Sequence, residues 1–150
     1  MNYSIVYTDS YRERAEIHDT LYSYNLSKTG ADRQDVQAKD EPGAGAWIVK
    51  DENGKSYGGV VFHFLSEPRR IYVDYFYLAD AIRNQGWGMK VFAALEEFAR
   101  KEGAVSITLT TNTYQAPGFY KKAGFVQVGA KASPQPNVPD NIHYTFRKEL

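Results

Sequence analysis

Arg83-Asn84-Gln85-Gly86-Trp87-Gly88 is the stretch of sequence that decides the fold. The residues before it, Ile71 to Leu78, are β-branched and aromatic and predict a strand. The residues after it, Met89 to Glu102, predict a helix with an apolar stripe formed by Val91, Phe92, Leu95, Phe98 and Ala99. A strand, a glycine-bearing turn and a helix N-terminus together form a pyrophosphate-binding architecture, because the first N–H groups of a helix have no partner within it.

The turn does not match two familiar phosphate-binding motifs. The dinucleotide-binding fingerprint needs Gly or Ala three residues after its second glycine, where this chain has Val91. A P-loop needs Gly-Lys-Ser/Thr after four spacer residues, and the turn has no such sequence. Gly-x-Gly alone also suits an ordinary tight turn between a strand and a helix, so the rest of the chain must identify the ligand.

Composition limits the classes of protein. The length of 150 residues suits one domain, residues 1–150. The absence of cysteine excludes disulfides and thiolate chemistry, and three scattered histidines predict no metal site. With 18 basic and 18 acidic residues the formal charge is zero, which argues against a nucleic-acid partner. Because no apolar stretch approaches ~20 residues and no signal peptide is recognisable, we expect a cytoplasmic protein that has no membrane partner.

The first half of the chain predicts strands around one helix. Tyr3 to Thr8 predicts a strand, and Asp9 or Ser10 can cap the helix that follows, which fades by Gly30. Asp32 to Gly45 is polar and contains Gly and Pro, so we expect a loop there. Asn53-Gly54 is a hairpin signal because both residues tolerate positive φ. It separates the expected strands Ala46 to Lys50 and Ser56 to Leu65.

The second half completes a mixed α/β (α+β) sheet. Val105 to Thr110 predicts a strand parallel to Ile71–Leu78, because a helix connects the two. Gln115 to Ala123 predicts a short helix, and two further strands follow at Phe125–Val128 and His143–Phe146. We expect a mostly antiparallel central sheet with helices on both faces. The aromatic strand Tyr144 to Phe146 is compatible with a homodimer.

The chain resembles the GNAT superfamily of acyl-CoA-dependent N-acyltransferases. Arg83, Gly86 and Gly88 match the family motif Arg/Gln-x-x-Gly-x-Gly/Ala. The run Ala116-Pro117-Gly118-Phe119-Tyr120-Lys121-Lys122-Ala123-Gly124-Phe125 resembles its second signature, A-x-x-[LF]-Y-x-x-x-G-F. The order of the predicted elements also matches, so the resemblance covers nearly the whole chain.

The chain departs from the family pattern at one position. The family often has Asn three residues before the alanine of the second signature, where this chain has Thr113, with Asn112 one place earlier. The stretch Tyr114 to Tyr120 is similar to a bacterial subgroup with an aromatic-Gln-Ala-Pro pattern, mostly of undefined substrate.

The resemblance implies how the chain binds acetyl-CoA. The sheet should splay between the parallel strands Ile71–Leu78 and Val105–Thr110, and the CoA arm should enter that gap. Backbone groups of the first strand should pair with pantetheine, amides of the turn should hold the pyrophosphate, and Lys122 or Arg69 could reach the 3′-phosphate. The implied contacts are Phe76, Tyr77, Leu78, Arg83, Asn84, Gln85, Gly86, Trp87, Gly88, Met89, Asn112, Phe119 and Lys122.

Acyl transfer to an amine needs a proton acceptor and benefits from a proton donor at the leaving sulfur. Tyr120 matches the family tyrosine next to the CoA sulfur and is the expected acid. Asp74 is the expected base, because Tyr72, Asp74, Phe76 and Leu78 alternate on one face of the strand and apolar neighbours raise the pKa of a carboxylate. The alternatives for Asp74 are an ion pair or a site that binds the cationic acceptor.

Other side chains carry weaker signals. His63 ranks below Asp74 as a chemical group, and His18 and His143 rank lower still. Aromatic walls would suit a cationic amine, and the candidates are Tyr22, Tyr24, Trp47, Phe64 and Tyr72.

We therefore expect an N-acetyltransferase that transfers an acetyl group from acetyl-CoA directly to a primary amine of a small molecule or a peptide. The alternative is a non-catalytic acyl-CoA-binding regulatory module that has kept the fold and lost the reaction. Retention of Tyr120 favours the enzyme.

Overall fold

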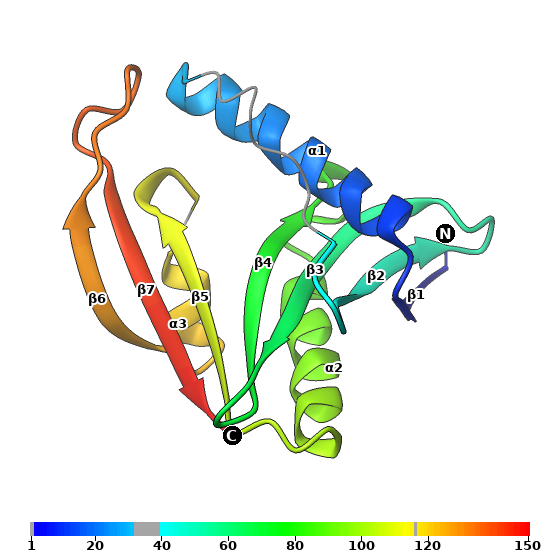
Figure 1. Ribbon diagram of the computed structural model, residues 1–150. Helices are drawn as coiled ribbons and strands as arrows, with labels where there is room; N and C mark the ends of the chain where they lie inside the picture. The colour runs from blue at the N-terminus through cyan, green and yellow to red at the C-terminus, as the bar shows by residue number, and fades with distance from the viewer. Residues whose placement is uncertain (1, 32–39, 116) are drawn as a thin grey trace.

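The computed structural model describes residues 2–31, 40–115 and 117–150. Its centre is a seven-stranded sheet with the order β1-β2-β3-β4-β5-β7-β6 (Figure 1). The strands are β1 (Tyr3–Thr8), β2 (Gly45–Asp51), β3 (Ser56–Leu65), β4 (Arg70–Leu78), β5 (Ser106–Asn112), β6 (Val126–Ala132) and β7 (Ile142–Glu149). Among the strand pairs that the described residues form, only β4–β5 is parallel. The predicted mixed, mostly antiparallel sheet is confirmed.

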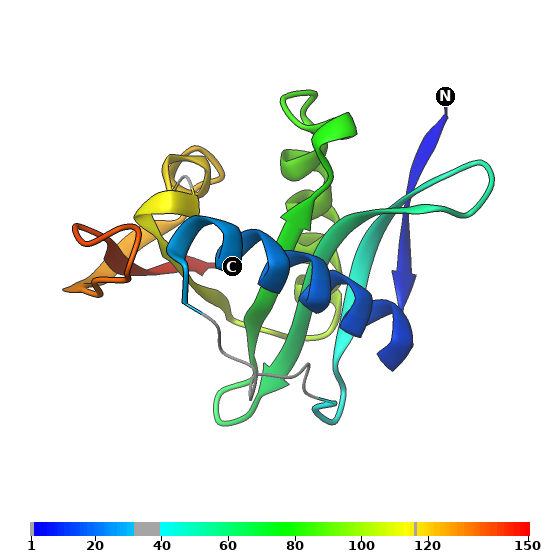
Figure 2. The same ribbon diagram turned by 90° about the horizontal axis from the view of Figure 1, so that it is seen from above.

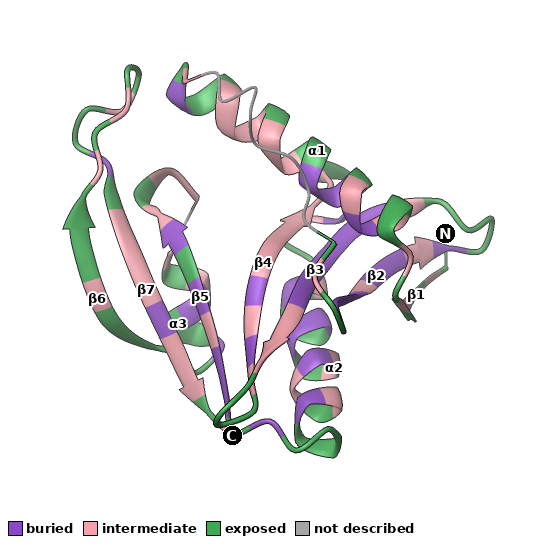
Figure 3. Cartoon of the chain, viewed as in Figure 1, coloured by how far each residue is buried: buried purple, intermediate pink, exposed green. Residues whose placement is uncertain are grey.

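Helices cover both faces of this sheet, as predicted (Figure 2). They are α1 (Tyr11–Thr29), α2 (Trp87–Lys101) and α3 (Gly118–Lys122), with short 3₁₀ turns η1 (Asp80–Ile82) and η2 (Thr113–Gln115). Ser10 caps α1, because its side chain accepts the Glu13 N–H. Burial is concentrated in the central strands and the inner side of α2, whereas most of β6 is exposed (Figure 3).

The parallel strands β4 and β5 meet only over a short length. Their paired positions are Ile71 with Ile107 and Tyr72 with Thr108. Beyond these pairs the two strands diverge, so that the sheet opens into a V in Figure 1. The predicted splayed parallel pair is confirmed. The rest of β4 up to Leu78 is hydrogen-bonded to β3 on one side and has no strand on the other side within the described residues.

A β-bulge at Asp74 changes which side chains of β4 share a face. Val61 pairs with Tyr75 and the next residue, Phe62, pairs with Val73, so Asp74 is the extra residue. Val73 and Phe76 consequently both pack in the apolar cluster on the α2 side, although they are three residues apart. The predicted alternation of Tyr72, Asp74, Phe76 and Leu78 on one face is therefore wrong beyond the bulge.

Two further predictions are corrected in detail. The hairpin at Asn53-Gly54 is confirmed, but only Gly54 of this pair has a positive φ, 81°. The predicted helix from Gln115 to Ala123 is shorter, Gly118–Lys122, and follows a separate 3₁₀ turn.

The homodimer stays a prediction, and the structure shows where the aromatic strand Tyr144 to Phe146 lies. β7 lies between β5 and β6, and Phe146 is fully buried, so this strand offers no free edge. The predicted loop from Asp32 to Gly45 lies largely outside the described residues, and β2 already begins at Gly45. In the described part of the chain, none of the helices combines the length and apolar character of a membrane span.

Candidate active site

A cavity of about 530 Å³ fills the splay between β4 and β5. We call it the donor cavity. The side of β4 from Val73 to Leu78 forms one wall, and the end of β5 from Leu109 to Asn112 forms the other. It brings together the predicted site residues Asp74, Phe76, Tyr77, Leu78, Arg83, Asn112, Phe119 and Tyr120.

The turn at the end of this cavity has the backbone geometry that an anion site needs. Asn84 and Gly86 both have a positive φ, 60° and 84°, and Gly86 directly precedes the first turn of α2. A Cβ on Gly86 would meet nothing within 4 Å, so conformation and not crowding favours glycine here. The first N–H groups of α2 have no partner within the helix and lie at its positive end.

The donor cavity and the turn together fit an acyl-CoA. An extended pantetheine arm needs an unpaired strand edge, and β4 provides one beyond Tyr72. The pyrophosphate needs N–H donors, and the start of α2 at Trp87 provides them. The other predicted turn contacts, Asn84, Gln85, Gly86, Gly88 and Met89, lie on this same segment. Lys122 is exposed on α3 and does not line the donor cavity.

Arg83 is held at the wall of the cavity by three kinds of contact. Its Nε donates to the Leu78 carbonyl at 2.8 Å, and its Nη1 lies 2.8 Å from Asp80 Oδ1. Its guanidinium also lies over the rings of Tyr24 and Tyr77, at 5.5 and 5.1 Å from their centroids. Arg83, the first residue of the motif that contains Gly86 and Gly88, thus fixes the path of the chain from β4 into the turn.

Tyr120 lies in an aromatic cluster at the inner end of the donor cavity. Its side chain is 7% exposed and contacts the rings of Phe76, Phe92, Phe119, Phe125 and Phe146. Burial raises the pKa of the Tyr120 phenol well above its ordinary value of 10. The hydroxyl is therefore protonated at neutral pH, as a hydrogen-bond donor must be.

Asp74 is paired with His63. Its Oδ2 lies 2.8 Å from His63 Nδ1, and both side chains are 16% exposed. His63 also packs against Tyr72 at a centroid distance of 5.7 Å. Of the alternatives for Asp74, pairing with a neighbouring side chain is observed, and the partner is a histidine.

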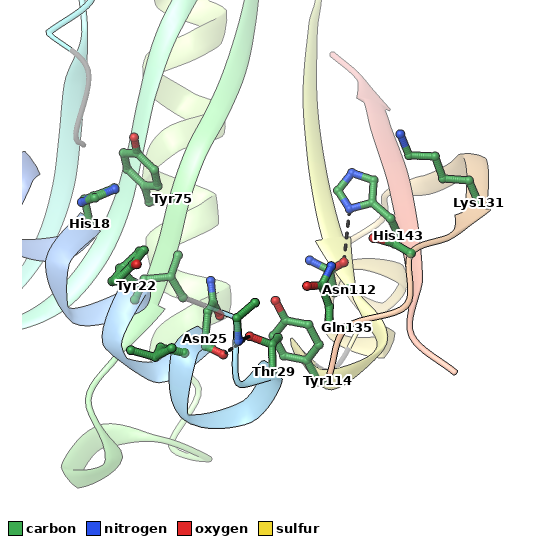
Figure 4. A pocket seen from close by; sticks show the side chains of 14 residues that line it. His18, Tyr22, Asn25, Thr29, Tyr75, Asn112, Tyr114, Lys131, Gln135 and His143 are labelled. Carbon is green, nitrogen blue, oxygen red and sulfur yellow. Dashed lines mark hydrogen bonds between the residues drawn. The ribbon is translucent and has the colours of Figure 1, made fainter. Parts of the chain in front are cut away.

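A second cavity, of about 300 Å³, adjoins the first between α1 and the β6–β7 hairpin (Figure 4). We call it the second cavity. His18 and Tyr75 lie on one side of it, and His143 and Lys131 lie on the other. The two cavities share the lining residues Leu21, Asn25, Tyr75, Asn112 and Tyr114. A molecule in the second cavity therefore lies next to the donor cavity.

An amide cluster forms the border between the two cavities. Gln115 Oε1 accepts the backbone N–H of Asn112 at 3.0 Å and its side-chain Nδ2 at 2.9 Å. Gln115 Nε2 donates to Asn25 Oδ1 at 2.9 Å, which ties the end of β5 to α1. Asn112 was predicted as a cofactor contact, and the structure places it at the junction.

Several predicted wall residues lie elsewhere. Tyr22 lines the second cavity and Tyr24 lines the donor cavity, as predicted for aromatic walls. Trp47 and Phe64 instead pack against Phe98 on the α2 side, because they face away from α1. Tyr72 lines neither cavity and lies beside His63.

Sequence reasoning gave no role in a site to Tyr75, Tyr114 or Lys131 of the second cavity, and it ranked His143 low. The bulge at Asp74 decides the face of Tyr75. His143 and Lys131 come together only because β6 and β7 pair at these positions. Within the described ranges no group of His, Cys, Asp and Glu side chains could hold a metal ion.

The sequence profile of the acetyltransferase (GNAT) family matches residues 8–125. A curated acetyltransferase of Agrobacterium fabrum is 29% identical over 123 residues, which cover 81% of each chain. Blasticidin-S acetyltransferase of Streptomyces morookaense is 33% identical over 101 residues, covering 66% of this chain and 70% of that protein. A protein of Bacillus anthracis solved with acetyl coenzyme A shares the fold, with a TM-score of 0.64 and 17% identity over 80% of this chain and 73% of that chain.

Proposed function

The chain belongs to the acetyltransferase (GNAT) family, and from this premise we propose that it transfers an acetyl group from acetyl-CoA directly to a primary amine. The observation that supports this proposal best is the junction of the two cavities at Asn112 and Tyr75. The donor cavity has the strand edge and the helix N-terminus that an acyl-CoA requires. The second cavity adjoins the first at Asn112 and Tyr75, and an acceptor in it would approach the donor from there.

The bound acetyl-CoA supplies a thioester carbonyl carbon to the junction, and the chain must orient it. The free edge of β4 from Val73 to Leu78 aligns the donor, and the N–H groups from Arg83 to Met89 bind its pyrophosphate. The stacked rings of Phe76 and Phe119, 5.6 Å apart, form a water-excluding wall of the donor cavity. This arrangement holds the reacting carbon still while the amine approaches.

Tyr120 donates a hydrogen bond to the sulfur that leaves. A thiol has an ordinary pKa of about 8.5 and a phenol about 10, so complete proton transfer from the phenol is uphill. Burial raises the pKa of Tyr120 further and makes that transfer harder. The side chain therefore stabilises charge on the sulfur by hydrogen bonding, and solvent supplies the final proton.

Asp74 contributes a negative charge to the donor cavity that attracts the ammonium form of the acceptor. Its pairing with His63 fixes the carboxylate at 16% exposure and leaves it less available as a base. Of the two functional roles considered for Asp74, the pairing favours binding of the cation over proton removal.

The second cavity favours a small amine that also carries an anionic group. Lys131 is the one Lys or Arg among the described lining residues, and none of these residues is a carboxylate. The other polar groups are amides, hydroxyls and two histidines, which suit a hydrogen-bonding molecule. A cavity of about 300 Å³ holds a small molecule or the end of a longer chain. A polycation would lack a counter-charge there.

An antibiotic acceptor is the second candidate. It is favoured by the 33% identity with blasticidin-S acetyltransferase over 70% of that protein. The family match and Tyr120 in the donor cavity both argue against the regulatory alternative.

Thiol release from acetyl-CoA across an amine panel tests the proposal. The panel contains amino acids, amino phosphonates, polyamines, aminoglycosides, peptides and blasticidin S. We expect turnover with amines that carry an anion and weak or no turnover with polyamines. Isothermal titration with acetyl-CoA and CoA gives binding separately, and failure to bind either at millimolar concentration contradicts the proposed function.

A further inference from the structure

The tautomer of His143 can be derived from hydrogen bonds to backbone groups. The first of the side chains that orient His143 is Asn141, which is 3% exposed. Its Oδ1 accepts the Thr113 N–H at 3.1 Å, and its Nδ2 donates to the Ser133 carbonyl at 3.0 Å. Because a backbone N–H can only donate and a carbonyl can only accept, the amide of Asn141 has one possible orientation.

Asn112 is oriented in turn by two independent neighbours. Asn141 Nδ2 donates to Asn112 Oδ1 at 3.0 Å. On the other side, Gln115 Oε1 is fixed as an acceptor by the Asn112 backbone N–H, so Asn112 Nδ2 must donate to it. Both contacts place the oxygen of Asn112 toward β7.

His143 therefore carries a proton on Nδ1. This nitrogen lies 3.2 Å from Asn112 Oδ1, an atom that can only accept (Figure 4). In the neutral ring, a proton on Nδ1 leaves a lone pair on Nε2. Within the described residues Nε2 has no hydrogen-bond partner. The neutral ring thus presents an unused proton acceptor in the second cavity.

The surroundings keep the ring of His143 uncharged at neutral pH. Burial lowers its pKa below the ordinary value because an imidazolium loses solvation, and the ammonium of Lys131 on the paired strand β6 lowers it further. The other titratable groups around the second cavity are His18 and Tyr22 on α1, Tyr75 on β4 and Tyr114 after β5. No carboxylate among the described lining residues opposes this effect.

We propose that Nε2 of His143 is the proton acceptor for the amine nitrogen, directly or through one water. The inference rests on the proposed function, because it needs the acceptor in the second cavity. The C–N bond forms between the amine and the acetyl carbon while the C–S bond breaks. The proton lost by the nitrogen moves to Nε2, and the electron pair of the C–S bond leaves on sulfur, which is protonated from solvent.

A weak base suits this step. The proton of a free ammonium, with an ordinary pKa near 10.4, does not move to an imidazole of low pKa. Once the C–N bond begins to form, the nitrogen becomes far more acidic and the imidazole can accept its proton. Because the pKa of His143 is low, Nε2 carries no proton when the C–N bond begins to form. Asn112 stays hydrogen-bonded to Nδ1 throughout and stabilises the imidazolium that results.

Nitrogen NMR on the full chain tests the tautomer of His143 and needs no amine substrate. Long-range ¹H–¹⁵N spectra of uniformly labelled wild type, assigned with His143→Asn, should show a protonated Nδ1 and an unprotonated Nε2 at pH 7.5. The pKa from a pH titration should lie below 6.5 and should rise in Lys131→Gln. A protonated Nε2 in the neutral ring, or a charged ring at pH 7.5, overturns the proposal.

His143→Asn tests the proton transfer itself with an active acceptor from the panel. The asparagine amide can replace Nδ1–H as donor to Asn112 and has no group at the position of Nε2. We expect kcat at pH 7 to fall about 10²-fold or more, with unchanged acetyl-CoA affinity. We also expect Lys131→Gln to move the acidic limb of the wild-type pH–kcat profile to higher pH.

The outcomes separate the two proposals. Turnover by His143→Asn within about threefold of wild type, or an acidic limb that Lys131→Gln leaves in place, contradicts the role of His143 alone. Loss of acetyl-CoA affinity in His143→Asn would show that His143 has a structural role, and this result also contradicts its role as proton acceptor. No acetylated product from wild type with any amine, despite binding of acetyl-CoA, contradicts the proposed function, and the NMR result then still decides the tautomer.

Discussion

Gly88 lies directly against the ring of Phe119. A Cβ built on Gly88 would be 2.9 Å from Cε1 and 3.0 Å from Cζ of that ring, and 3.5 Å from Cζ of Phe76. Glycine is therefore needed at these two positions of the turn for different reasons. Gly86 has a positive φ in open space, whereas Gly88 allows the first turn of α2 to approach the aromatic wall of the donor cavity.

We predict that Gly88→Ala weakens donor binding more than it weakens the fold. Overpacking costs about 1–3 kcal/mol and better helix propensity returns about 1 kcal/mol, so Tm should fall by roughly 2–4 °C per kcal/mol lost. The displaced Phe119 ring should raise KM for acetyl-CoA several-fold. Gly118→Ala is the control, because a Cβ there meets nothing within 4 Å. Equal KM values for both variants would refute the packing argument.

Tyr120→Phe should lower kcat and leave stability nearly unchanged. The substitution keeps the ring contacts of Tyr120 in the aromatic cluster and removes only the hydroxyl. Loss of one donor at the sulfur should lower kcat by about 10–10²-fold with little change in KM, measured where chemistry limits the rate. Because the pKa of Tyr120 is raised, wild type should show no loss of activity from this group between pH 7 and 10. Full turnover by Tyr120→Phe excludes the donor role.

Asp74→Asn distinguishes the two functional roles of that carboxylate. If Asp74 attracts the cationic amine, KM for the amine should rise about tenfold and the acidic limb of the kcat profile should remain. If Asp74 were the base, kcat would fall and that limb would disappear. His63→Gln is the matched variant, since it breaks the 2.8 Å pairing and keeps the carboxylate. We expect its effect on KM to be smaller than that of Asp74→Asn.

Lys131→Glu should change the preference for acceptors. Lys131 is the one Lys or Arg among the described residues that line the second cavity, and its replacement places a carboxylate where the anion of the acceptor is expected. We expect kcat/KM to fall about tenfold or more for amines that carry an anion and to rise for diamines, in competition assays with both substrates present. A uniform loss for all amines would show that Lys131 does not select by charge.

More of the donor site than of the acceptor site could be predicted from the sequence. Arg83, Gly86 and Tyr120 belong to local motifs, and their backbone geometry follows from a few consecutive residues. The splay was expected from the resemblance to the family that these motifs indicate. The bulge at Asp74 has no local signature, because it arises where β3 and β4 lose register by one residue. One extra residue was enough to exchange the faces of Phe76 and Tyr75.

The hydrogen bonds around His143 depend on residues that the chain brings together from a distance. Asn112 and Asn141 are separated by 29 positions, and their amides meet only because β5 and β7 pair in one register. A lone histidine in a strand carries no sign of this contact. The sequence therefore ranked His143, like His18, below His63, although the structure shows that its Nδ1 donates to Asn112 Oδ1.

Acid should destabilise the fold through Asp51, at the hairpin between β2 and β3. Burial alone would raise the pKa of this carboxyl, but N–H groups of Lys55 and Asn53 and the Tyr57 hydroxyl donate to it and hold the pKa below its ordinary value. The carboxylate therefore contributes stability above the unfolded-state pKa of about 3.9, and this contribution is lost as the pH falls through the lower folded-state pKa.

Asp51→Asn should accordingly be less stable than wild type at pH 7, and the difference should shrink between pH 4 and pH 2. Urea unfolding of both proteins at pH 7, pH 4 and pH 2 measures this difference in stability. Glu97→Gln is the control, because Glu97 forms an exposed pair with Lys101 at 3.1 Å that contributes little at any pH. A stability difference for Asp51→Asn that is the same at pH 7 and pH 2 would mean that the hydrogen bonds to Asp51 do not depend on its charge.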